Sequence, residues 1–171
     1  MHPHDGLEER IFAVLEGPWV LSRTIPGHAT MRGSARFLRL SPVVLQYWEE
    51  GELRLATGTS MPARRDWYWL LAPGHLRIAF SGASGGPEGT LHRLHLHPGQ
   101  SAEGAWPLHA EDLHHCGQDT YLGRYHFENA TRISIDMLVR GPSKHYAIHT
   151  VLTRTWPMDP DTMDIEVRYP W

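Results

Sequence analysis

Apolar residues recur at every second position in short stretches along most of this chain. In residues 19–25, for example, Trp19, Leu21 and Ile25 fall on one side of the alternation. Successive side chains of an extended strand point to opposite faces, so this period of two predicts strands with one buried face. Turns rich in glycine and proline separate the stretches. We therefore expect about ten short strands, with a turn at 50–51, within residues 19–25, 35–37, 43–47, 53–55, 67–71, 76–80, 92–96, 114–127, 132–139 and 145–154.

The connections between these stretches decide the fold class. They are short turns, whereas parallel strands need long crossover connections that are usually helical, so we expect an antiparallel sheet. An open sheet of this length would expose two edges. Closure into an up-and-down barrel removes both edges and creates an interior that can hold one small ligand. We predict an all-β, antiparallel β-barrel that forms a single domain over residues 1–171, with a two-sheet sandwich as the alternative.

One short helix is expected ahead of the strands. Leu7, Ile11 and Leu15 recur at helical spacing. Asp5 is the expected N-cap, and Glu8 stands three residues later, where the carboxylate of a capping box belongs. We assign residues 1–17 to this helical segment. Residues 155–171 form a C-terminal extension with a weaker alternation, which is expected to add a final strand or to pack elsewhere.

Composition argues against several classes of function. The formal net charge is −3, and no cluster of basic residues is interleaved with aromatic ones, so a nucleic-acid partner has little support. The single cysteine, Cys116, excludes an intramolecular disulfide and a cysteine-rich zinc site, and it fits a reducing compartment. No apolar run approaches the roughly 20 residues that span a bilayer. We expect a cytoplasmic protein without a membrane partner.

Residues 114–127 carry the densest set of polar side chains. If this stretch is one strand, His115, Asp119, Tyr121 and Tyr125 share a face. A row with a base, an acid and two phenols suits the wall of a cavity, where a few polar groups orient a small molecule. The alternative is an edge strand with a solvated polar face.

His92 is expected to point into the same interior from another strand. With His115, Asp119 and Tyr121 it would form a hydrogen-bonded cluster, in which one histidine is a base oriented by Asp119. The alternative is a set of buried polar groups that satisfy one another and fix the strand register. Glu49 and Arg65 have opposite charges and would have to pair if both are buried. Further polar contacts to a ligand are expected from neighbouring strands, at Tyr47, Glu49, Arg65, Lys144 and Tyr146.

Short motifs follow one another in a definite order along the chain. They include Gly17-x-Trp19, Gly33-x-Ala35-x-Phe37, Tyr47-x-Glu49-x-Gly51, Leu91-His92-x-Leu94, His115-Cys116-x-x-Asp119-x-Tyr121 and Gly141-Pro142-x-Lys144-x-Tyr146. This series resembles an uncharacterised bacterial family of calycin-like barrels, a domain of unknown function. The resemblance implies the fold of lipocalins and fatty-acid-binding proteins, and it implies no activity. It also implies that Trp19 packs against a basic side chain of the closing strand, for which Arg154 is the candidate.

Three functions are compatible with such an interior. The first is binding of a small, partly apolar organic ligand. The second is cofactor-free acid–base catalysis, of the isomerase or cyclase type, in the same cavity. The third is a metal- or haem-binding barrel that uses His92, His115 and either Cys116 or Asp119. Neighbouring residues of a strand face opposite ways, so His115 and Cys116 cannot both ligate one metal without a bulge. No cofactor is assigned, and a homodimer is left open.

Overall fold

The computed structural model describes residues 6–99 and 106–154. Within them, the helix α1 (Leu7–Leu15) precedes a single antiparallel sheet, so the all-β prediction is confirmed. The strands are β1 (Gly17–Ile25), β2 (Ala29–Ser41), β3 (Val44–Leu55), β4 (Ser60–Ala72), β5 (His75–Ser81), β6 (Pro87–Leu94), β7 (His97–Pro98), β8 (Leu108–Cys116), β9 (Asp119–Asn129), β10 (Arg132–Arg140) and β11 (His145–Thr153). The predicted C-terminal extension lies outside the described residues.

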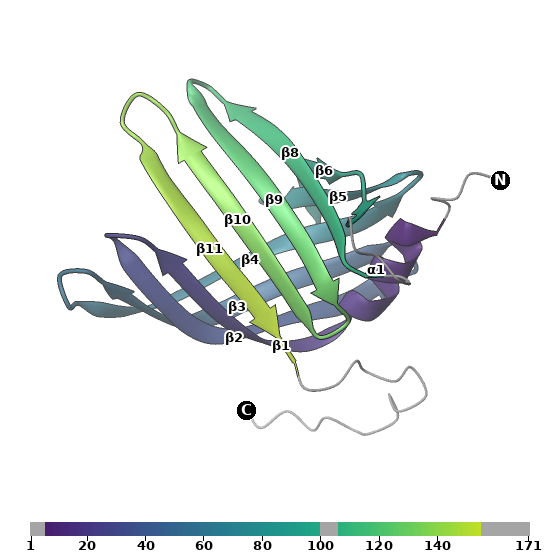
Figure 1. The fold of residues 1–171 in the computed structure, drawn as a ribbon, viewed down its shortest axis with the longest axis horizontal. Helices are drawn as coiled ribbons and strands as arrows, with labels where there is room; N and C mark the ends of the chain where they lie inside the picture. The colour runs from purple at the N-terminus through teal and green to yellow at the C-terminus, as the bar shows by residue number, and fades with distance from the viewer. Residues whose placement is uncertain (1–5, 100–105, 155–171) are drawn as a thin grey trace.

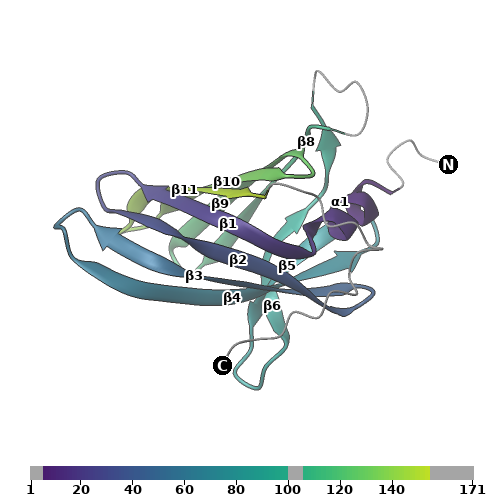
Figure 2. The ribbon, with the colours of Figure 1, turned by 90° about the horizontal axis from the view of Figure 1, so that it is seen from below.

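The sheet curls into a half-barrel with two facing walls (Figures 1 and 2). Its strand order is β6-β5-β4-β3-β2-β1-β11-β10-β9-β8-β7, so β1 pairs with both β2 and β11. One wall is formed by β8 to β11 and the other by β1 to β6. The helix α1 lies at one end, and the hairpin turns that follow β1, β3, β8 and β10 lie at the other. We call these the helix end and the open end.

The backbone ladder does not close the barrel within the described residues. The expected closure is replaced by a seam between β6 and β8, which side chains bridge. The backbone N–H of Arg93 donates to Asp112 Oδ2 at 2.7 Å. His92 reaches across the seam to the carbonyl oxygen of Tyr121 at 2.9 Å and to the hydroxyl of Tyr125 at 2.8 Å. The seam therefore depends on a few polar side chains where the rest of the sheet has a continuous ladder.

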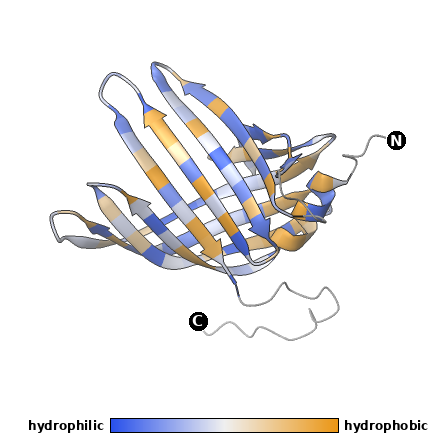
Figure 3. Cartoon of the chain, viewed as in Figure 1, coloured by the Kyte–Doolittle hydropathy of each residue, from blue (hydrophilic) through white to orange (hydrophobic). Residues whose placement is uncertain are grey.

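The predicted alternation is visible along the strands (Figure 3). In β1, buried and exposed residues alternate without interruption from Gly17 to Thr24. The turn predicted at 50–51 is wrong, because β3 runs through these residues and Gly51 pairs with Gly33 of β2. A Cβ at Gly33 would lie 2.0 Å from the carbonyl oxygen of Glu50. Glycine marks a close approach of two strands here.

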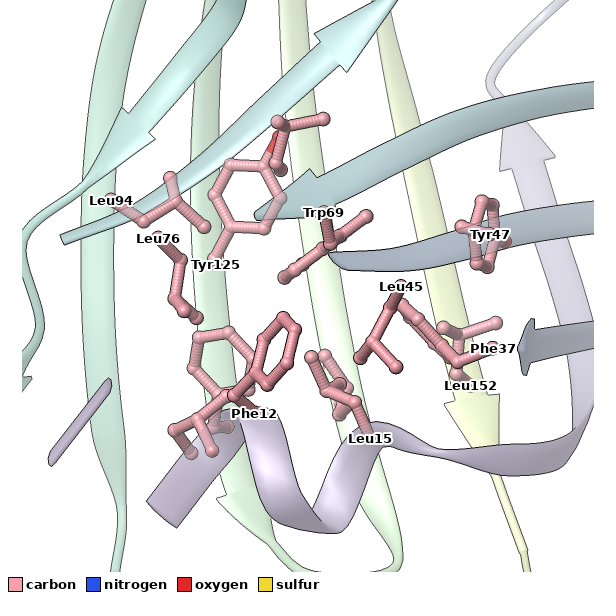
Figure 4. Close-up of a cluster of buried hydrophobic side chains, with 14 of the residues drawn as sticks. Phe12, Leu15, Phe37, Leu45, Tyr47, Trp69, Leu76, Leu94, Tyr125 and Leu152 are labelled. Carbon is pink, nitrogen blue, oxygen red and sulfur yellow. The ribbon is translucent and has the colours of Figure 1, made fainter. Parts of the chain in front are cut away.

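The helix α1 closes its end of the half-barrel with an apolar core. Phe12 and Leu15 point from the helix towards Leu45, Trp69 and Tyr125 of the sheet (Figure 4), and all five side chains are buried. Full burial of a side chain of this size contributes roughly 1.5–3 kcal/mol. Buried side chains of the helix and the sheet therefore fill this end of the half-barrel.

The start of α1 differs from the prediction. The N-cap is Gly6, with a φ of 104°, and no side chain within the described part of the chain caps the helix. Glu8 is buried, and its Oε1 accepts a hydrogen bond from the backbone N–H of Leu96 at 3.4 Å, so within the described residues it joins the helix to the chain after β6. The predicted N-cap, Asp5, lies outside the described residues. None of the described helices has the length and apolar character needed to cross a membrane.

The predicted contact between Trp19 and Arg154 is confirmed. The guanidinium carbon of Arg154 lies 4.0 Å from the centre of the Trp19 ring. Arg154 also donates to the carbonyl oxygens of Ala130 (3.1 Å), Glu16 (2.8 Å) and Val14. One cation therefore joins the end of α1, the turn between β9 and β10, and the first strand.

Candidate functional site

A cavity of about 370 Å³ lies between the two walls. This volume is within the roughly 300–1,000 Å³ that is usual for small-molecule sites. Most of its lining is apolar and comes from β2, β4, β5, β6, β10 and β11: Phe37, Trp67, Trp69, Ile78, Phe80, Leu91, Ile135, Met137, Val139, Ile148 and Leu152. An organic body would replace water here at a gain of about 25 cal/mol for each Å² of apolar surface.

Polar side chains interrupt this lining in two places. Arg23, Tyr47 and Arg65 contribute from β1, β3 and β4, while His114, Cys116 and Tyr121 contribute from β8 and β9. We call the first group the arginine wall and the second the histidine wall. Between them lie Tyr125, Tyr146 and Thr150. A ligand in the cavity would thus meet two guanidinium groups and a phenol on one side, and an imidazole, a thiol and a phenol on the other.

Glu49 binds all three side chains of the arginine wall and is not itself part of the cavity lining. Its side chain is 1% exposed, and its two oxygens accept from Arg23 at 2.7 and 2.9 Å in a bidentate pair. Arg65 donates from Nε at 2.7 Å, as predicted for the Glu49–Arg65 pair, and Tyr47 donates its hydroxyl at 2.5 Å. Nε of Arg23 donates to Thr150 Oγ1 at 2.8 Å. Four strands are therefore joined by one ionic network.

This network moves two pKa values in opposite directions. Burial alone would raise the pKa of Glu49, but the hydrogen bonds from Arg23 and the charge of Arg65 outweigh burial, so the pKa lies below its ordinary value. Burial, together with the neighbouring Glu49 carboxylate, raises the pKa of the Tyr47 hydroxyl well above its usual range. At neutral pH the carboxylate is charged and the phenol is a neutral donor.

Lys144 and Asp119 form a second ion pair near the open end. Lys144 Nζ lies 2.6 Å from Asp119 Oδ2 and 3.0 Å from the hydroxyl of Tyr121. The hydrogen bond to Asp119, followed by that to Tyr121, raises the pKa of Lys144. The structure therefore brings together three predicted residues, of which Tyr121 also lines the cavity. Tyr146, on the neighbouring part of β11, lines it as well.

His92 lies behind the cavity lining and is fully buried. A carbonyl oxygen can only accept, so Nε2 carries the proton that bonds Tyr121, and Nδ1 accepts from the hydroxyl of Tyr125. Burial lowers the pKa of His92, against the opposing effect of the Tyr121 carbonyl. Gly123 makes room for the ring, because a Cβ there would lie 2.5 Å from His92 Cε1. The neutral imidazole has no free nitrogen for a ligand.

His115 is not brought to this cluster. Residues 114–127 form two strands and not one, because a turn at Gly117, with a φ of 60°, separates β8 from β9. His115 pairs with Thr120 and is exposed on the outer face, whereas the neighbouring His114 and Cys116 line the cavity. The predicted shared face of His115 and Asp119 is therefore wrong. Among the described residues, no three histidine, cysteine or acidic side chains are placed to hold a metal ion.

Comparison with protein families gives one match that covers most of the chain. The model of a family of unknown function, DUF6314, matches residues 15–154. The chain belongs to the DUF6314 family. This confirms the predicted membership of a family of unknown function, and the match ends at Arg154, the residue that stacks on Trp19. No curated protein matches this DUF6314 chain.

The solved structures that are similar to this DUF6314 protein include several designed barrels. EF1p2_mFAP2b bound to DFHBI is 15% identical, with a TM-score of 0.48 and coverage of 86% of this chain and 98% of its own. The redesigned barrel mFAP1 bound to DFHBI is 14% identical, with a TM-score of 0.46 and coverage of 85% and 99%. A fluorescence-activating barrel designed de novo is 10% identical, with a TM-score of 0.44 and coverage of 81% and 92%.

Sequence reasoning did not assign the polar cavity residues Arg23, His114 and Thr150 of the DUF6314 protein to the ligand site, and it named Cys116 only as a candidate metal ligand. The signal for His114 and Cys116 was present, since Cys116-Gly117 opens a tight turn, and a turn breaks the alternation between the residues on its two sides. Arg23 shares the buried face of β1 with Trp19 and Leu21, so the alternation already indicated a charged side chain pointing inward there.

Proposed function

We propose that this DUF6314 protein binds a small, partly apolar organic molecule in the cavity between its two walls. The observation that carries the proposal is the cavity itself, about 370 Å³ in volume and lined mainly by aromatic and aliphatic side chains. The helix end is filled by α1, and core side chains such as Phe37, Trp69 and Tyr125 continue from it into the cavity lining. A side-chain-filled barrel would have packed both ends.

The predicted polar residues take different parts in this proposal. Tyr47, Arg65, Tyr121 and Tyr146 face the cavity and would contact the ligand directly. Glu49 and Lys144 would orient Arg65 and Tyr121, while Asp119 would hold Lys144. His92 would support Tyr125 from behind. His115 is exposed and has no part in the site that we propose.

We further propose that the protein is a calycin-like, single-domain carrier of the cytoplasm. The stack of Arg154 on Trp19 supports the calycin relationship, because the same contact is what the resemblance implies. The single cysteine supports a reducing compartment.

The alternative function, acid–base catalysis, is not supported by the positions of its predicted histidine and Asp119. It required a histidine oriented by Asp119, but Asp119 is bonded to Lys144, and both nitrogens of His92 are occupied. General acid–base catalysis needs the catalytic group within hydrogen-bond reach of its partner and substrate. Binding is therefore the function that the geometry supports best.

Native mass spectrometry of the protein as isolated tests this proposal. A bound molecule should appear as an added mass that is released unchanged on denaturation. Where the isolated protein is empty, the neutral dye N-phenyl-1-naphthylamine serves as the probe, with fluorescence as the signal. Ile148→Trp fills the cavity and should remove binding, whereas Val20→Trp, at an outward position that is 62% exposed, should not. Equal binding by both variants, or none by the wild type, would refute the proposal.

A further inference from the structure

We propose that the ligand is a small organic acid and that Arg65 binds its anionic group. This inference rests on the proposed function and names the chemical class of the ligand. It follows from the balance of charge around the cavity, in which the described residues leave one guanidinium uncompensated.

The arginine wall contains two cations and one anion. Glu49 Oε1 accepts from Arg23 and Arg65, and Oε2 accepts from Arg23 and Tyr47. A carboxylate offers about four acceptor positions, so these four hydrogen bonds saturate it. Glu49 can neutralise only one of the two guanidinium groups. The wall therefore keeps one unit of positive charge that its own carboxylate cannot balance.

The excess charge is available at Arg65 and not at Arg23. Arg23 is buried, and all three of its nitrogens have partners, in Thr150, Met31 and Glu49. Arg65 uses Nε alone for its hydrogen bond to Glu49, within the described part of the chain. Its side chain is 44% exposed and lines the cavity. The two terminal nitrogens are thus left to bind two oxygens of an anionic acid group as a bidentate fork.

Trp67 fixes the direction of this fork. The guanidinium carbon of Arg65 lies 5.4 Å from the centre of the Trp67 ring, and Trp67 is itself part of the apolar lining. Stacking and the bond to Glu49 restrict the guanidinium before any ligand arrives, which lowers the entropic cost of binding. An acid group at Arg65 would leave the rest of the molecule against the tryptophan and its apolar neighbours.

Lys144, the other predicted cation, is already neutralised. Its ammonium is bonded to the carboxylate of Asp119 and to the hydroxyl of Tyr121. The remaining polar groups of the histidine wall are a histidine, a cysteine and a tyrosine, none of which is a fixed cation. An anionic ligand is therefore expected to orient with its acid group towards the arginine wall.

Two dyes with the same aromatic body test the inference. N-phenyl-1-naphthylamine is neutral, and 1-anilinonaphthalene-8-sulfonate adds one anionic group to it. The wild type should bind the sulfonate at least about tenfold more tightly, because a charged hydrogen-bonded pair contributes on the order of 1.5–3 kcal/mol. In Arg65→Gln this preference should disappear while the neutral dye still binds. Arg64→Gln is the matched control and should keep the preference, because Arg64 is the exposed neighbour of Arg65 on β4 and does not line the cavity.

The outcomes separate this inference from the proposed function. An unchanged preference in Arg65→Gln, with normal binding of the neutral dye, would overturn the acid at Arg65 and leave cavity binding intact. Failure of the neutral dye to bind the wild type would remove the proposed function itself. If Arg65→Gln does not fold, displacement of the neutral dye from the wild type decides. Decanoate should then displace it at a concentration at least about tenfold lower than decanol does, and equal displacement would refute the inference.

Discussion

Glu49 is the side chain on which the arginine wall depends. Glu49→Gln should lower the free energy of unfolding by about 3–5 kcal/mol, because it leaves the buried charge of Arg23 without its partner. Urea denaturation measures the change. Glu52→Gln is the matched control on the same strand. The side chains of Glu52 and its partner Arg54 are 61% and 66% exposed, so their ion pair should contribute less than about 1 kcal/mol to the free energy of unfolding. Equal effects of the two substitutions would contradict the network.

The same carboxylate predicts a dependence of stability on pH. Its folded-state pKa lies below the ordinary value of 4.5, because the contacts with Arg23 and Arg65 outweigh burial. A depressed pKa contributes stability that is complete above pH 4.5 and is lost as the pH falls below it. The difference in unfolding free energy between wild type and Glu49→Gln should thus be constant from about pH 7 to 5 and shrink towards about pH 3.5. A difference that does not change with pH would contradict this linkage.

For single residues, the sequence predicted which charges must pair better than it predicted which side chains meet. The pairing of Glu49 with Arg65 followed from the cost of burying either charge alone. The role of Arg23 did not follow, because nothing in the sequence says which of several arginines reaches a given carboxylate across two strands. Residue type determines which pairs are needed, and register determines which pairs form.

The hairpin of β8 and β9 shows how one turn changes the composition of a site. Counting through residues 114–127 as one strand placed His115 inside. The turn at Gly117 resets the alternation, so His114 and Cys116 face the cavity and His115 faces outward. A shift of one residue exchanges the two faces of a strand. Strand existence was therefore predictable from the period, while the facing of each residue needed the turn.

A substitution at Gly123 tests whether the missing side chain on β9 makes room for the His92 ring at the seam. Gly123→Ala should destabilise the protein by about 1–3 kcal/mol, because its Cβ would lie 2.5 Å from His92 and 2.8 Å from the ring of Tyr125, both of them buried. The penalty should shrink in a His92→Ala background, where the clash with the imidazole is gone. Thermal or urea unfolding of the four proteins of this cycle gives the coupling. Strictly additive effects would show that the ring does not cause the constraint.

The two ends of the molecule differ in what their side chains do. At the helix end, α1, Trp19 and Arg154 are joined by apolar packing and by hydrogen bonds to carbonyl oxygens. Towards the open end, the cavity is flanked by polar side chains. The antiparallel, curled architecture followed from period and turns. The unclosed seam did not, because a hydrophobic pattern describes which face is buried and not which edges meet.

Arg154→Lys tests this division. A lysine cannot reproduce the planar fork that reaches Ala130, Glu16 and Val14 or the stack on Trp19, so the free energy of unfolding should fall by about 2–4 kcal/mol. The affinity for N-phenyl-1-naphthylamine should not change, because Arg154 is outside the cavity lining. Lys144→Gln, at the other end, should change unfolding little, since its ion pair with Asp119 is partly exposed and screened by water. Loss of dye affinity in Arg154→Lys at full stability would show that the two ends are not independent.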